Sequence, residues 1–336
     1  MLNVAINGLG RIGRATLKIV LNQPTLHLTA VNDVLTADNL AYLLKFDTVY
    51  GRWTREVRSH DNFLNIDGKN YPVLGEREPA RLPWREMGVD VVFECTGVFR
   101  ERDDLVKHIE AGARFVILSA PAKSENVPTV IHAVNRFRQN PAQIISCASC
   151  TTNCITPVVE VMGRRIGIKK ATMTTIHAYT SNQSIVDSGR MDFRRGRAAA
   201  ANLVPASTGA AVATTRALPE LRGKFDGVAV RVPVAVGSLA DIVFVTARGT
   251  SVEEVNGIFK EEALTERYRE VLAVTEEPIV SSDIIQQAYA SIVDLSMTQV
   301  VDQDLVKIMS WYDNEWGYAN QMVREALQWS GAVSGS

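Results

Sequence analysis

The chain has 336 residues, enough for two domains that each bury a core. Its formal net charge is −1, with 36 basic and 37 acidic residues, which argues against nucleic-acid or membrane partners and leaves small molecules. No apolar run is long enough to span a bilayer, and the apolar start of the chain reads as a strand and not as a signal peptide. The four cysteines, three of them within eight residues, do not resemble a disulfide framework, so we expect a reducing cytoplasm.

A glycine fingerprint follows the first predicted strand. Residues 2–7 read as a buried strand, a turn containing Gly8, Gly10 and Gly13 comes next, and residues 14–21 continue as an amphipathic helix. Gly8 permits a tight turn, Gly10 lets the backbone approach a pyrophosphate, and Gly13 lets the helix pack on the strand. The sequence therefore predicts a dinucleotide site, with the phosphates at the helix N-terminus.

A second apolar strand, residues 26–31, leads to Asp33, about 20 residues after Gly13. A carboxylate at this place can accept hydrogen bonds from the adenosine ribose hydroxyls, and its charge would repel a 2′-phosphate. The alternative is a turn residue at the end of a strand. With the fingerprint upstream, we interpret Asp33 as a ribose ligand and expect NAD as the cofactor.

Strands and helices continue to alternate in the first half of the chain. Residues 89–94 and 114–119 read as strands on either side of a helical stretch, and residues 57–74 read as an antiparallel insertion around Asp67-Gly68. This alternation predicts an α/β fold with a doubly wound parallel sheet of the Rossmann type, whose ligands bind at the carboxyl ends of the strands. We expect this NAD-binding domain to cover residues 1–150 and to be completed by the C-terminal helix, at about 315–336.

The second half of the chain contains a thiol and an imidazole that are candidate catalytic groups. Cys150 lies in a run of small residues, and His177 ends an apolar strand downstream. A thiolate is a strong nucleophile, and a nearby imidazole can take its proton. Cys147, Cys150 and Cys154 could nominally ligate a metal, but no fourth ligand is close in sequence, so we predict no metal site. We assign Cys154 to packing.

The pattern changes after Cys154. A helix is predicted at 155–163, and strands at 171–177, 227–234, 240–247 and 304–311. This order indicates an α+β catalytic domain over residues 151–314 on a mainly antiparallel sheet. Residues 179–209 show no clear strand and read as a long binding loop. A last helix, 317–329, places Met322, Ala326 and Trp329 on one face.

Seven blocks of residues together resemble one family: 6–14, 119–123, 148–154, 174–180, 205–210, 231–233 and 311–318. Over essentially its full length the chain resembles the phosphorylating glyceraldehyde-3-phosphate dehydrogenases. The resemblance implies NAD-dependent oxidation of glyceraldehyde 3-phosphate to 1,3-bisphosphoglycerate in glycolysis, by a homotetramer. Cys150 would form a hemithioacetal and then a thioester, with His177 as base.

The resemblance also implies further site residues. The cofactor would be positioned by residues of both halves of the chain, namely Arg11, Ile12, Arg77, Ser119 and Asn314. The substrate phosphate and inorganic phosphate would be bound by hydroxyls, backbone N–H groups and guanidinium groups, which suit anions. These groups belong to Ser149, Thr151, Thr180, Arg195, Thr208, Gly209 and Arg231.

The chain departs from the family in several places. Cys147 stands where the family usually has Asn, and Val234–Gly237 replaces a more polar segment. Ser188-Gly189 is smaller than the usual residues near the adenosine ribose, which leaves NADP as a secondary cofactor. One alternative is an erythrose-4-phosphate dehydrogenase, which the retained Thr180 and Thr208 argue against. A non-enzymatic NAD-binding regulatory protein would have lost the nucleophile.

Overall fold

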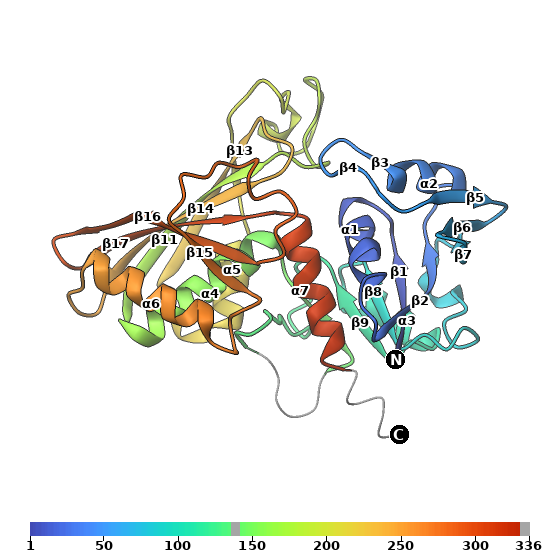
Figure 1. Cartoon of the computed structure of the whole chain (residues 1–336), viewed down its shortest axis with the longest axis horizontal. Coiled ribbons are helices and arrows are strands. Elements are labelled where there is room, and N and C mark those ends of the chain that lie inside the picture. Colours follow the sequence, from blue (N-terminus) through green and yellow to red (C-terminus); the bar gives the residue numbers. More distant parts are fainter. Residues whose placement is uncertain (136–141, 330–336) are drawn as a thin grey trace. The chain divides into compact units, whose positions relative to one another are not determined.

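The computed structural model describes residues 1–135 and 142–329. The described residues form two compact units, shown with their elements in Figure 1. Unit 1 comprises residues 1–130, 142–148 and 319–329, and unit 2 comprises residues 131–135 and 149–318. Within the described part of the chain, no helix combines the length and apolar character that a membrane crossing requires.

Unit 1 is built on a sheet with the strand order β10-β9-β8-β1-β2-β7-β6-β5. Six of its strands run parallel: β1 (Leu2–Asn7), β2 (Leu26–Asn32), β7 (Lys69–Leu74), β8 (Val91–Glu94), β9 (Phe115–Leu118) and β10 (Ile144–Ser146). The helices α1 (Arg11–Val20) and α3 (Arg102–Glu110) connect them. The central strand β1 lies between β2 and β8, so the strand order reverses there. The predicted Rossmann-type sheet is confirmed, and its switch point is where such folds bind nucleotides.

The predicted antiparallel insertion is also present. It follows α2 (Ala37–Lys45) and the short strands β3 (Phe46–Asp47) and β4 (Gly51–Arg52), and it consists of β5 (Val57–His60), β6 (Phe63–Ile66) and β7. Asp67 and Gly68 turn the chain between β6 and β7 with φ of 50° and 82°. Two successive positive φ angles define the tight hairpin turn that Asp-Gly favours. The 3-10 helix η1 (Pro79–Arg81) follows.

Unit 2 is built on a second sheet, with the order β12-β13-β11-β14-β17-β16-β15. Its strands are β11 (Ile168–Ala178), β12 (Val204–Ser207), β13 (Phe225–Val232), β14 (Ser238–Thr246), β15 (Leu272–Thr275), β16 (Ser291–Val301) and β17 (Leu305–Tyr312). Only the β11–β13 and β15–β16 pairs are parallel, so the predicted, mainly antiparallel sheet is confirmed. Its helical elements are α4 (Cys150–Arg165), α5 (Ala210–Ala217), α6 (Val252–Leu264), η2 (Arg194–Gly196) and η3 (Pro219–Leu221).

Some predicted elements differ from the structure. Helix α4 begins at Cys150 and not at 155, because the Ser149 side chain caps it by accepting a 3.1 Å bond from the Thr152 N–H. The prediction that 179–209 holds no strand is wrong, since β12 pairs with β13 at the edge of the sheet. That strand is short and contains Pro205, which an edge position tolerates.

The last helix, α7 (Trp316–Leu327), matches the prediction for 317–329 to within two residues. Met322, Ala326 and Trp329, which were predicted to share one face, are all buried, and the Trp329 ring stacks on Phe115 at 4.5 Å between centroids. Of the helix expected at about 315–336, residues 330–336 lie outside the described residues.

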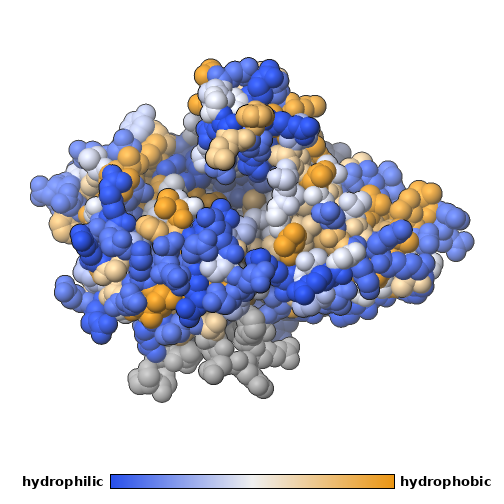
Figure 2. Space-filling model, turned by 180° about the vertical axis from the view of Figure 1, so that it is seen from behind, coloured by the Kyte–Doolittle hydropathy of each residue, from blue (hydrophilic) through white to orange (hydrophobic). Residues whose placement is uncertain are grey.

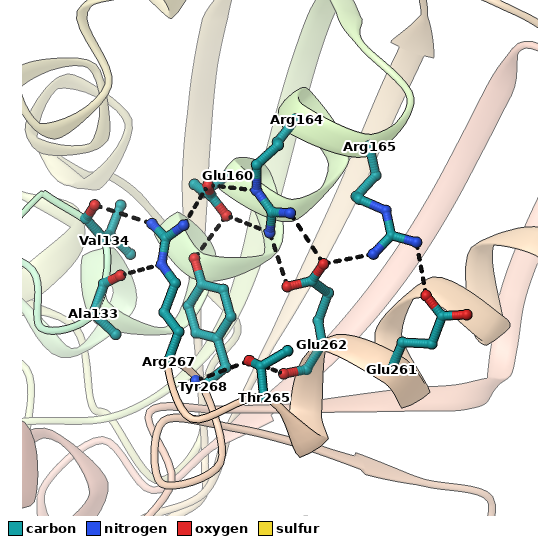
Figure 3. A network of polar contacts seen from close by, with 10 residues as sticks. All are labelled: Ala133, Val134, Glu160, Arg164, Arg165, Glu261, Glu262, Thr265, Arg267 and Tyr268. Atoms are coloured by element: carbon teal, nitrogen blue, oxygen red, sulfur yellow. Dashed lines mark hydrogen bonds and ion pairs between the residues drawn. The ribbon is translucent and has the colours of Figure 1, made fainter.

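A polar network joins α4 to α6 within unit 2 (Figure 3). Arg164 donates to Glu160 on its own helix at 2.9 Å and to Glu262 on α6 at 2.8 Å. Glu160 also accepts from the Tyr268 hydroxyl at 2.7 Å and from Arg267 at 3.0 Å. Burial alone would raise the pKa of the Glu160 carboxyl, but its bonds to Arg164 and Tyr268 outweigh burial and the pKa is lowered. The network therefore fixes the helix that carries Cys150 through charged groups with satisfied partners.

Candidate active site

At two positions of the glycine turn of unit 1, Gly8 and Gly13, sterics allow no other residue. Gly8 has a φ of 92°, and a Cβ there would lie 2.7 Å from the Thr96 nitrogen. A Cβ on Gly13 would lie 1.9 Å from the Gly8 carbonyl oxygen. Gly10 is the N-cap of α1, makes no side-chain cap and faces open space. The first turn of α1 is thus accessible to an anion such as a pyrophosphate, and these residues fit a dinucleotide.

Asp33 lies directly after β2, at the same edge of the sheet. Its Oδ2 accepts from the Leu9 N–H at 2.6 Å and its Oδ1 from the Leu35 N–H at 2.9 Å. Each carboxylate oxygen has a second lone pair to offer, and the side chain is partly exposed. The two backbone bonds orient the carboxylate next to the glycine turn.

The other cofactor residues proposed in unit 1 also follow strand ends or the turn. Arg77 is exposed and lies three residues after β7, and Ser119 directly follows β9. Arg11 and Ile12 open α1, but the Arg11 guanidinium forms a 2.6 Å ion pair with Asp47. Its side chain therefore binds the strand β3, and its backbone at the helix start is the part that suits a phosphate.

A buried network beneath the turn was not assigned from the sequence. The Trp84 indole donates to His108 Nδ1 at 3.1 Å, so the neutral ring carries its proton on Nε2 and donates to Glu94 Oε2 at 3.1 Å. Glu94 also accepts from Asn7 at 2.6 Å and from the Thr96 N–H at 2.8 Å. The network thereby fixes the segment that packs against Gly8. In the sequence, this network was indicated only by the polar residues Asn7 and Glu94 at the ends of β1 and β8.

In unit 2, Cys150 is the first residue of α4, and its Sγ lies 3.4 Å from His177 Nε2. Burial raises the pKa of the thiol, while the Arg231 guanidinium and hydrogen bonds from Thr151 act in the opposite direction. A position at a helix N-terminus also favours the thiolate. The structure therefore brings together the thiol and the imidazole that the sequence singled out.

His177 lies on β11 and is almost fully buried. Its Nδ1 is 2.7 Å from the Ala178 carbonyl oxygen and 2.6 Å from Arg231 Nη1. Burial first, and then the charge of Arg231, lower the pKa of His177 to about 3. The imidazole is therefore neutral near pH 7, which is the state that a general base requires.

Tyr312 is a site residue that the sequence reasoning missed. Its buried hydroxyl bonds to Thr151 at 2.9 Å and to Thr175 at 2.7 Å, and its ring meets His177 edge-on at 5.9 Å between centroids. Tyr312 thus contacts both Thr151, which follows the nucleophile, and the imidazole of His177. In the sequence, an aromatic residue in an apolar strand is predicted to belong to the hydrophobic core. Only the position of Tyr312 in the block 311–318 indicated a role in the site.

Two helix N-termini carry four of the proposed anion-binding residues. Ser149 and Thr151 lie at the start of α4, and Thr208 and Gly209 precede α5. The two helices pack together, with Thr156 and Thr214 hydroxyls 3.1 Å apart. The Ser149 hydroxyl caps α4, the Thr151 hydroxyl binds Tyr312, and the Thr208 hydroxyl accepts from the Ala210 N–H at 3.2 Å. Gly209 is exposed, with open space around it.

Arg195 and Arg231 supply positive charge near the imidazole. Burial lowers the pKa of Arg231, and repulsion from Arg195 lowers it further. Arg195 donates to Asp192 at 3.0 Å, whereas the buried Nε of Arg231 has no hydrogen-bond partner among the described residues. Thr180 lies two residues beyond β11, partly exposed. The two guanidinium groups repel each other, and the Arg231 Nε–H has no partner among the described residues. An anion bound between such groups would be stabilised by both charges.

Asn314 is held in one orientation. Its Oδ1 accepts from the Gly237 N–H at 3.1 Å and from the Ser238 hydroxyl at 3.1 Å, which leaves the Nδ2 group as a donor. Ser238 also accepts from the Ala178 N–H at 3.1 Å, a link that the sequence did not indicate. The divergent segment Val234–Gly237 therefore still supplies a backbone donor to Asn314.

The remaining cysteines and Ser188 have structural contacts. Cys154 is fully buried, with Sγ 3.8 Å from the Ser310 carbonyl oxygen, and burial raises its pKa to about 12, so the packing role is confirmed. Burial also raises the pKa of Cys147. The Ser188 hydroxyl lies 2.6 Å from that of Ser184. Within residues 1–135 and 142–329, no group of three metal-ligating side chains occurs.

A Rossmann-type sheet with its glycine turn, together with a thiol held against a neutral imidazole, defines a nucleotide-dependent dehydrogenase that works through a cysteine. Comparison with known proteins gives the family. Residues 2–102 match the family model described as glyceraldehyde 3-phosphate dehydrogenase, NAD binding domain, and residues 149–314 match the C-terminal domain of the same enzyme. The chain belongs to the glyceraldehyde-3-phosphate dehydrogenase family.

Several relatives match nearly end to end. The chain is 46% identical over 325 residues to the glyceraldehyde-3-phosphate dehydrogenase of Streptomyces coelicolor, covering 96% of each chain. It is 46% identical over 322 residues to that of Geobacillus stearothermophilus, covering 95% of this chain and 96% of the relative. It is 45% identical to glyceraldehyde-3-phosphate dehydrogenase 1 of Bacillus subtilis, with the same coverage.

Proposed function

We propose that the protein catalyses the NAD-dependent, phosphorylating oxidation of glyceraldehyde 3-phosphate to 1,3-bisphosphoglycerate. The observation that carries the proposal is the 3.4 Å contact between Cys150 Sγ and His177 Nε2, in a chain of this family. A retained thiol and base argue against a purely regulatory, non-enzymatic role. The retained Thr180 and Thr208 argue against release of a free acid from erythrose 4-phosphate.

The chemistry of the thiol follows from this contact. Cys150 transfers its proton to His177 Nε2, and the thiolate attacks the aldehyde carbon. His177 returns that proton to the carbonyl oxygen, which completes a hemithioacetal and leaves Nε2 free to accept again. His177 then takes the proton of the hemithioacetal hydroxyl as the carbon is oxidised to a thioester. NAD, when bound, supplies the two-electron acceptor for that step. An oxygen of inorganic phosphate attacks the thioester carbon, the Cys150 thiolate leaves, and the product is an acyl phosphate.

The proposed NAD site uses the residues whose geometry fits it. The turn Gly8–Gly13 and the start of α1 would hold the pyrophosphate, and Asp33 would accept the ribose hydroxyl protons. Arg77 and Ser119 lie at the same sheet edge. Asn314 would donate from Nδ2 to the nicotinamide carboxamide, since its Oδ1 already accepts two bonds. We accordingly propose unit 1 as the NAD-binding domain and unit 2 as the catalytic domain.

Two sets of donors would bind the two phosphate groups. Arg231 and Thr180 form one set and Arg195 lies near Arg231, which suits the substrate phosphate. The N-termini of α4 and α5 form the other, which suits inorganic phosphate. The members of this second set are Ser149, Thr151, Thr208 and Gly209.

We also propose that the protein forms a homotetramer and is located in the cytoplasm. The loop before β12 exposes large apolar side chains, with Ile185 84%, Met191 103% and Phe193 86% accessible. Figure 2 shows orange, hydrophobic side chains among hydrophilic ones on the loop at the top of the view. Exposed apolar groups of this kind support a contact between copies of the chain. Light scattering that shows a fully active monomer at micromolar concentration would contradict the tetramer.

The test of the function is a phosphate-dependent assay. Purified protein is mixed with glyceraldehyde 3-phosphate and NAD, and NADH is followed with and without inorganic phosphate. Rapid NADH formation that requires phosphate is expected, and erythrose 4-phosphate should be the poorer substrate. Equal rates without phosphate, or a preference for erythrose 4-phosphate, would overturn the proposal.

A further inference from the structure

Three central parallel strands of unit 1 end in a row of buried polar side chains. Glu94, Asn7 and Asn32 are the last residues of β8, β1 and β2, and they lie directly opposite one another in the register of the sheet. Residues paired in this way project from the same face, so their side chains meet. Asn7 Nδ2 lies 2.6 Å from Glu94 Oε2, and Asn7 Oδ1 lies 2.7 Å from Asn32 Nδ2. The row lies one residue before the glycine turn on β1 and one residue before Asp33 on β2.

Glu94 accepts every hydrogen bond that reaches it. Its Oε2 accepts from Asn7 Nδ2 and from His108 Nε2, and its Oε1 accepts from the backbone N–H and the hydroxyl of Thr96. Four accepted bonds fill the lone pairs of an ionised carboxylate. The side chain is fully buried, and no lysine or arginine forms an ion pair with it among the described residues. The charge is therefore stabilised by these four donors.

A carboxylate that only accepts determines how both asparagine amides are oriented. Asn7 must present Nδ2 to Glu94, so its Oδ1 faces Asn32, which must in turn present Nδ2. In this orientation Asn32 Nδ2 also donates to the Glu76 carbonyl oxygen at 2.8 Å, and its Oδ1 accepts from the Glu76 N–H at 3.0 Å. We call these two bonds the Glu76 clamp. The row therefore ends by fixing the backbone directly before Arg77.

The same carboxylate fixes the segment after β8. The Thr96 hydroxyl, which donates to Glu94, also accepts from the Val98 N–H at 3.1 Å. The Thr96 nitrogen is the atom that a Cβ on Gly8 would meet at 2.7 Å. Glu94 thus holds the segment that packs against the glycine turn, and through the asparagines it holds the segment before Arg77.

We propose that Glu94 is a positioning residue for the cofactor, whose charge orients Asn7 and Asn32 and so holds these two segments in place before NAD binds. This inference rests on the proposed NAD site. A protein whose binding-competent geometry is only partly populated binds its ligand more weakly by that fraction. Loss of the Glu94 charge should therefore weaken NAD binding, while the chemical step should proceed normally once NAD is bound.

The first test is Glu94→Gln, which keeps the shape of the side chain and introduces an NH₂ group among four donors. If that group faces Asn7, both asparagine amides must reverse and the Glu76 clamp opens. If it faces Thr96, the Thr96 N–H loses its acceptor. Titration calorimetry without aldehyde or phosphate should give a Kd for NAD raised about tenfold, as expected when about one-tenth of the molecules hold the competent geometry. A Kd equal to that of the wild type would overturn the proposal.

Steady-state kinetics distinguish positioning from partial unfolding. The KM of Glu94→Gln for NAD should rise by the same factor with kcat unchanged, because saturating NAD restores the competent geometry. A lower kcat with an unchanged KM would mean that Glu94 only supports the fold, which overturns the positioning role.

Trp84→Phe is the matched control. Trp84 donates to His108 Nδ1 at 3.1 Å, so the variant removes a buried hydrogen bond of the same network and leaves the row of Glu94, Asn7 and Asn32 intact. It should lower the unfolding temperature and leave the Kd for NAD unchanged. An equal rise of the Kd in Trp84→Phe and Glu94→Gln would show that any loss of packing in unit 1 weakens NAD binding, which overturns the proposal.

A second substitution tests the direction of the bonds. Asn7→Asp in the Glu94→Gln background moves the carboxylate one strand along the row, where it again accepts from Asn32 and restores the Glu76 clamp. The double variant should recover most of the NAD affinity that Glu94→Gln loses. Asn7→Asp alone should be impaired, because two adjacent buried carboxylates repel each other. A folded double variant that recovers no affinity would contradict the proposed direction.

The row can also be observed without NAD. Amide hydrogen exchange of Glu94→Gln should be faster at the Glu76 N–H or the Thr96 N–H than in Trp84→Phe, because the acceptors of both depend on Glu94. Unchanged protection at both amides would exclude the role of Glu94. None of the binding and exchange measurements needs turnover. A wild type that binds NAD without phosphate-dependent NADH formation refutes the proposed reaction alone, whereas equal NAD affinity in the wild type and Glu94→Gln refutes the positioning role alone.

Discussion

His177 and Arg231 lie directly opposite each other in the parallel register of β11 and β13, and their side chains meet at 2.6 Å between Nδ1 and Nη1. A parallel pair places such residues on the same face of the sheet. The base and the arginine are therefore positioned by backbone pairing and not by loops. This rigidity fixes the imidazole that faces the thiol of Cys150.

Cys150→Ser should lower the rate of NADH formation by about 10⁴-fold or more, because an alcohol near its ordinary pKa is a far weaker nucleophile. NAD affinity should be nearly unchanged, which titration calorimetry can measure. Cys154→Ala is the control, since Cys154 lies on the same helix and is fully buried, with its Sγ against Ser291 and Ser310. Full activity of Cys150→Ser, with Cys154 proving essential, would refute the assignment.

His177→Asn should slow the oxidation step by about 10²–10⁴-fold, because the variant lacks the group that takes protons from the thiol and the hemithioacetal. Stopped-flow absorbance at a single turnover separates this step from product release. A solvent isotope effect on the residual rate should differ from that of the wild type. Wild-type single-turnover rates in the variant would show that another group is the base.

Acid should destabilise the protein partly through His177. Its pKa is lowered from 6.5 to about 3 in the folded chain, so the unfolded chain binds the proton first as the pH falls. The wild type should lose about 1.4 kcal/mol of unfolding free energy per pH unit below 6.5 that His177→Asn does not lose. Urea unfolding at pH 6.5, 5.5 and 4.5, at one protein concentration, measures this difference. Parallel pH profiles would mean that the pKa of His177 is the same in the folded and the unfolded chain.

Asp33→Ala should raise the kcat/KM ratio of NADP to NAD by about 10- to 100-fold, because it removes the charge that repels a 2′-phosphate. The wild type should prefer NAD, with measurable NADP use. Asp33→Asn is the matched control for the carboxylate's bonds to Leu9 and Leu35, since it removes the charge and keeps one acceptor oxygen. Both variants should shift the ratio in the same direction. A wild type that prefers NADP would place Asp33 away from the ribose.

Glu160→Gln should lower the unfolding free energy by about 1–3 kcal/mol, because it weakens the bonds to Arg164, Arg267 and Tyr268 in a largely buried site. The kcat should stay close to that of the wild type. The exposed pair of Arg248 and Glu254 provides the comparison, and Glu254→Gln should have a much smaller effect. Equal losses in the two variants would mean that burial adds nothing to the network.

The amino-acid sequence alone determined the parts that depend on local order. The strand, turn and helix around Gly8 and Gly13 follow one another in the chain, and Gly13 relieves a clash with the Gly8 carbonyl oxygen inside the same turn. The hairpin turn at Asp67 likewise depends on neighbouring residues. A helix boundary depends on a single capping side chain, and the Ser149 cap begins α4 five residues earlier than the sequence predicted.

Tertiary structure decided which distant residues meet. Tyr312 reaches Thr151 across 161 positions, and Arg231 reaches His177 across 54. Neither pairing follows from periodicity, because strand register depends on the packing of the whole sheet and not on any single segment. The sequence identified the imidazole beside the thiol, but only the fold placed a guanidinium on its other nitrogen, and that contact exists because two strands far apart in the chain pair in one register.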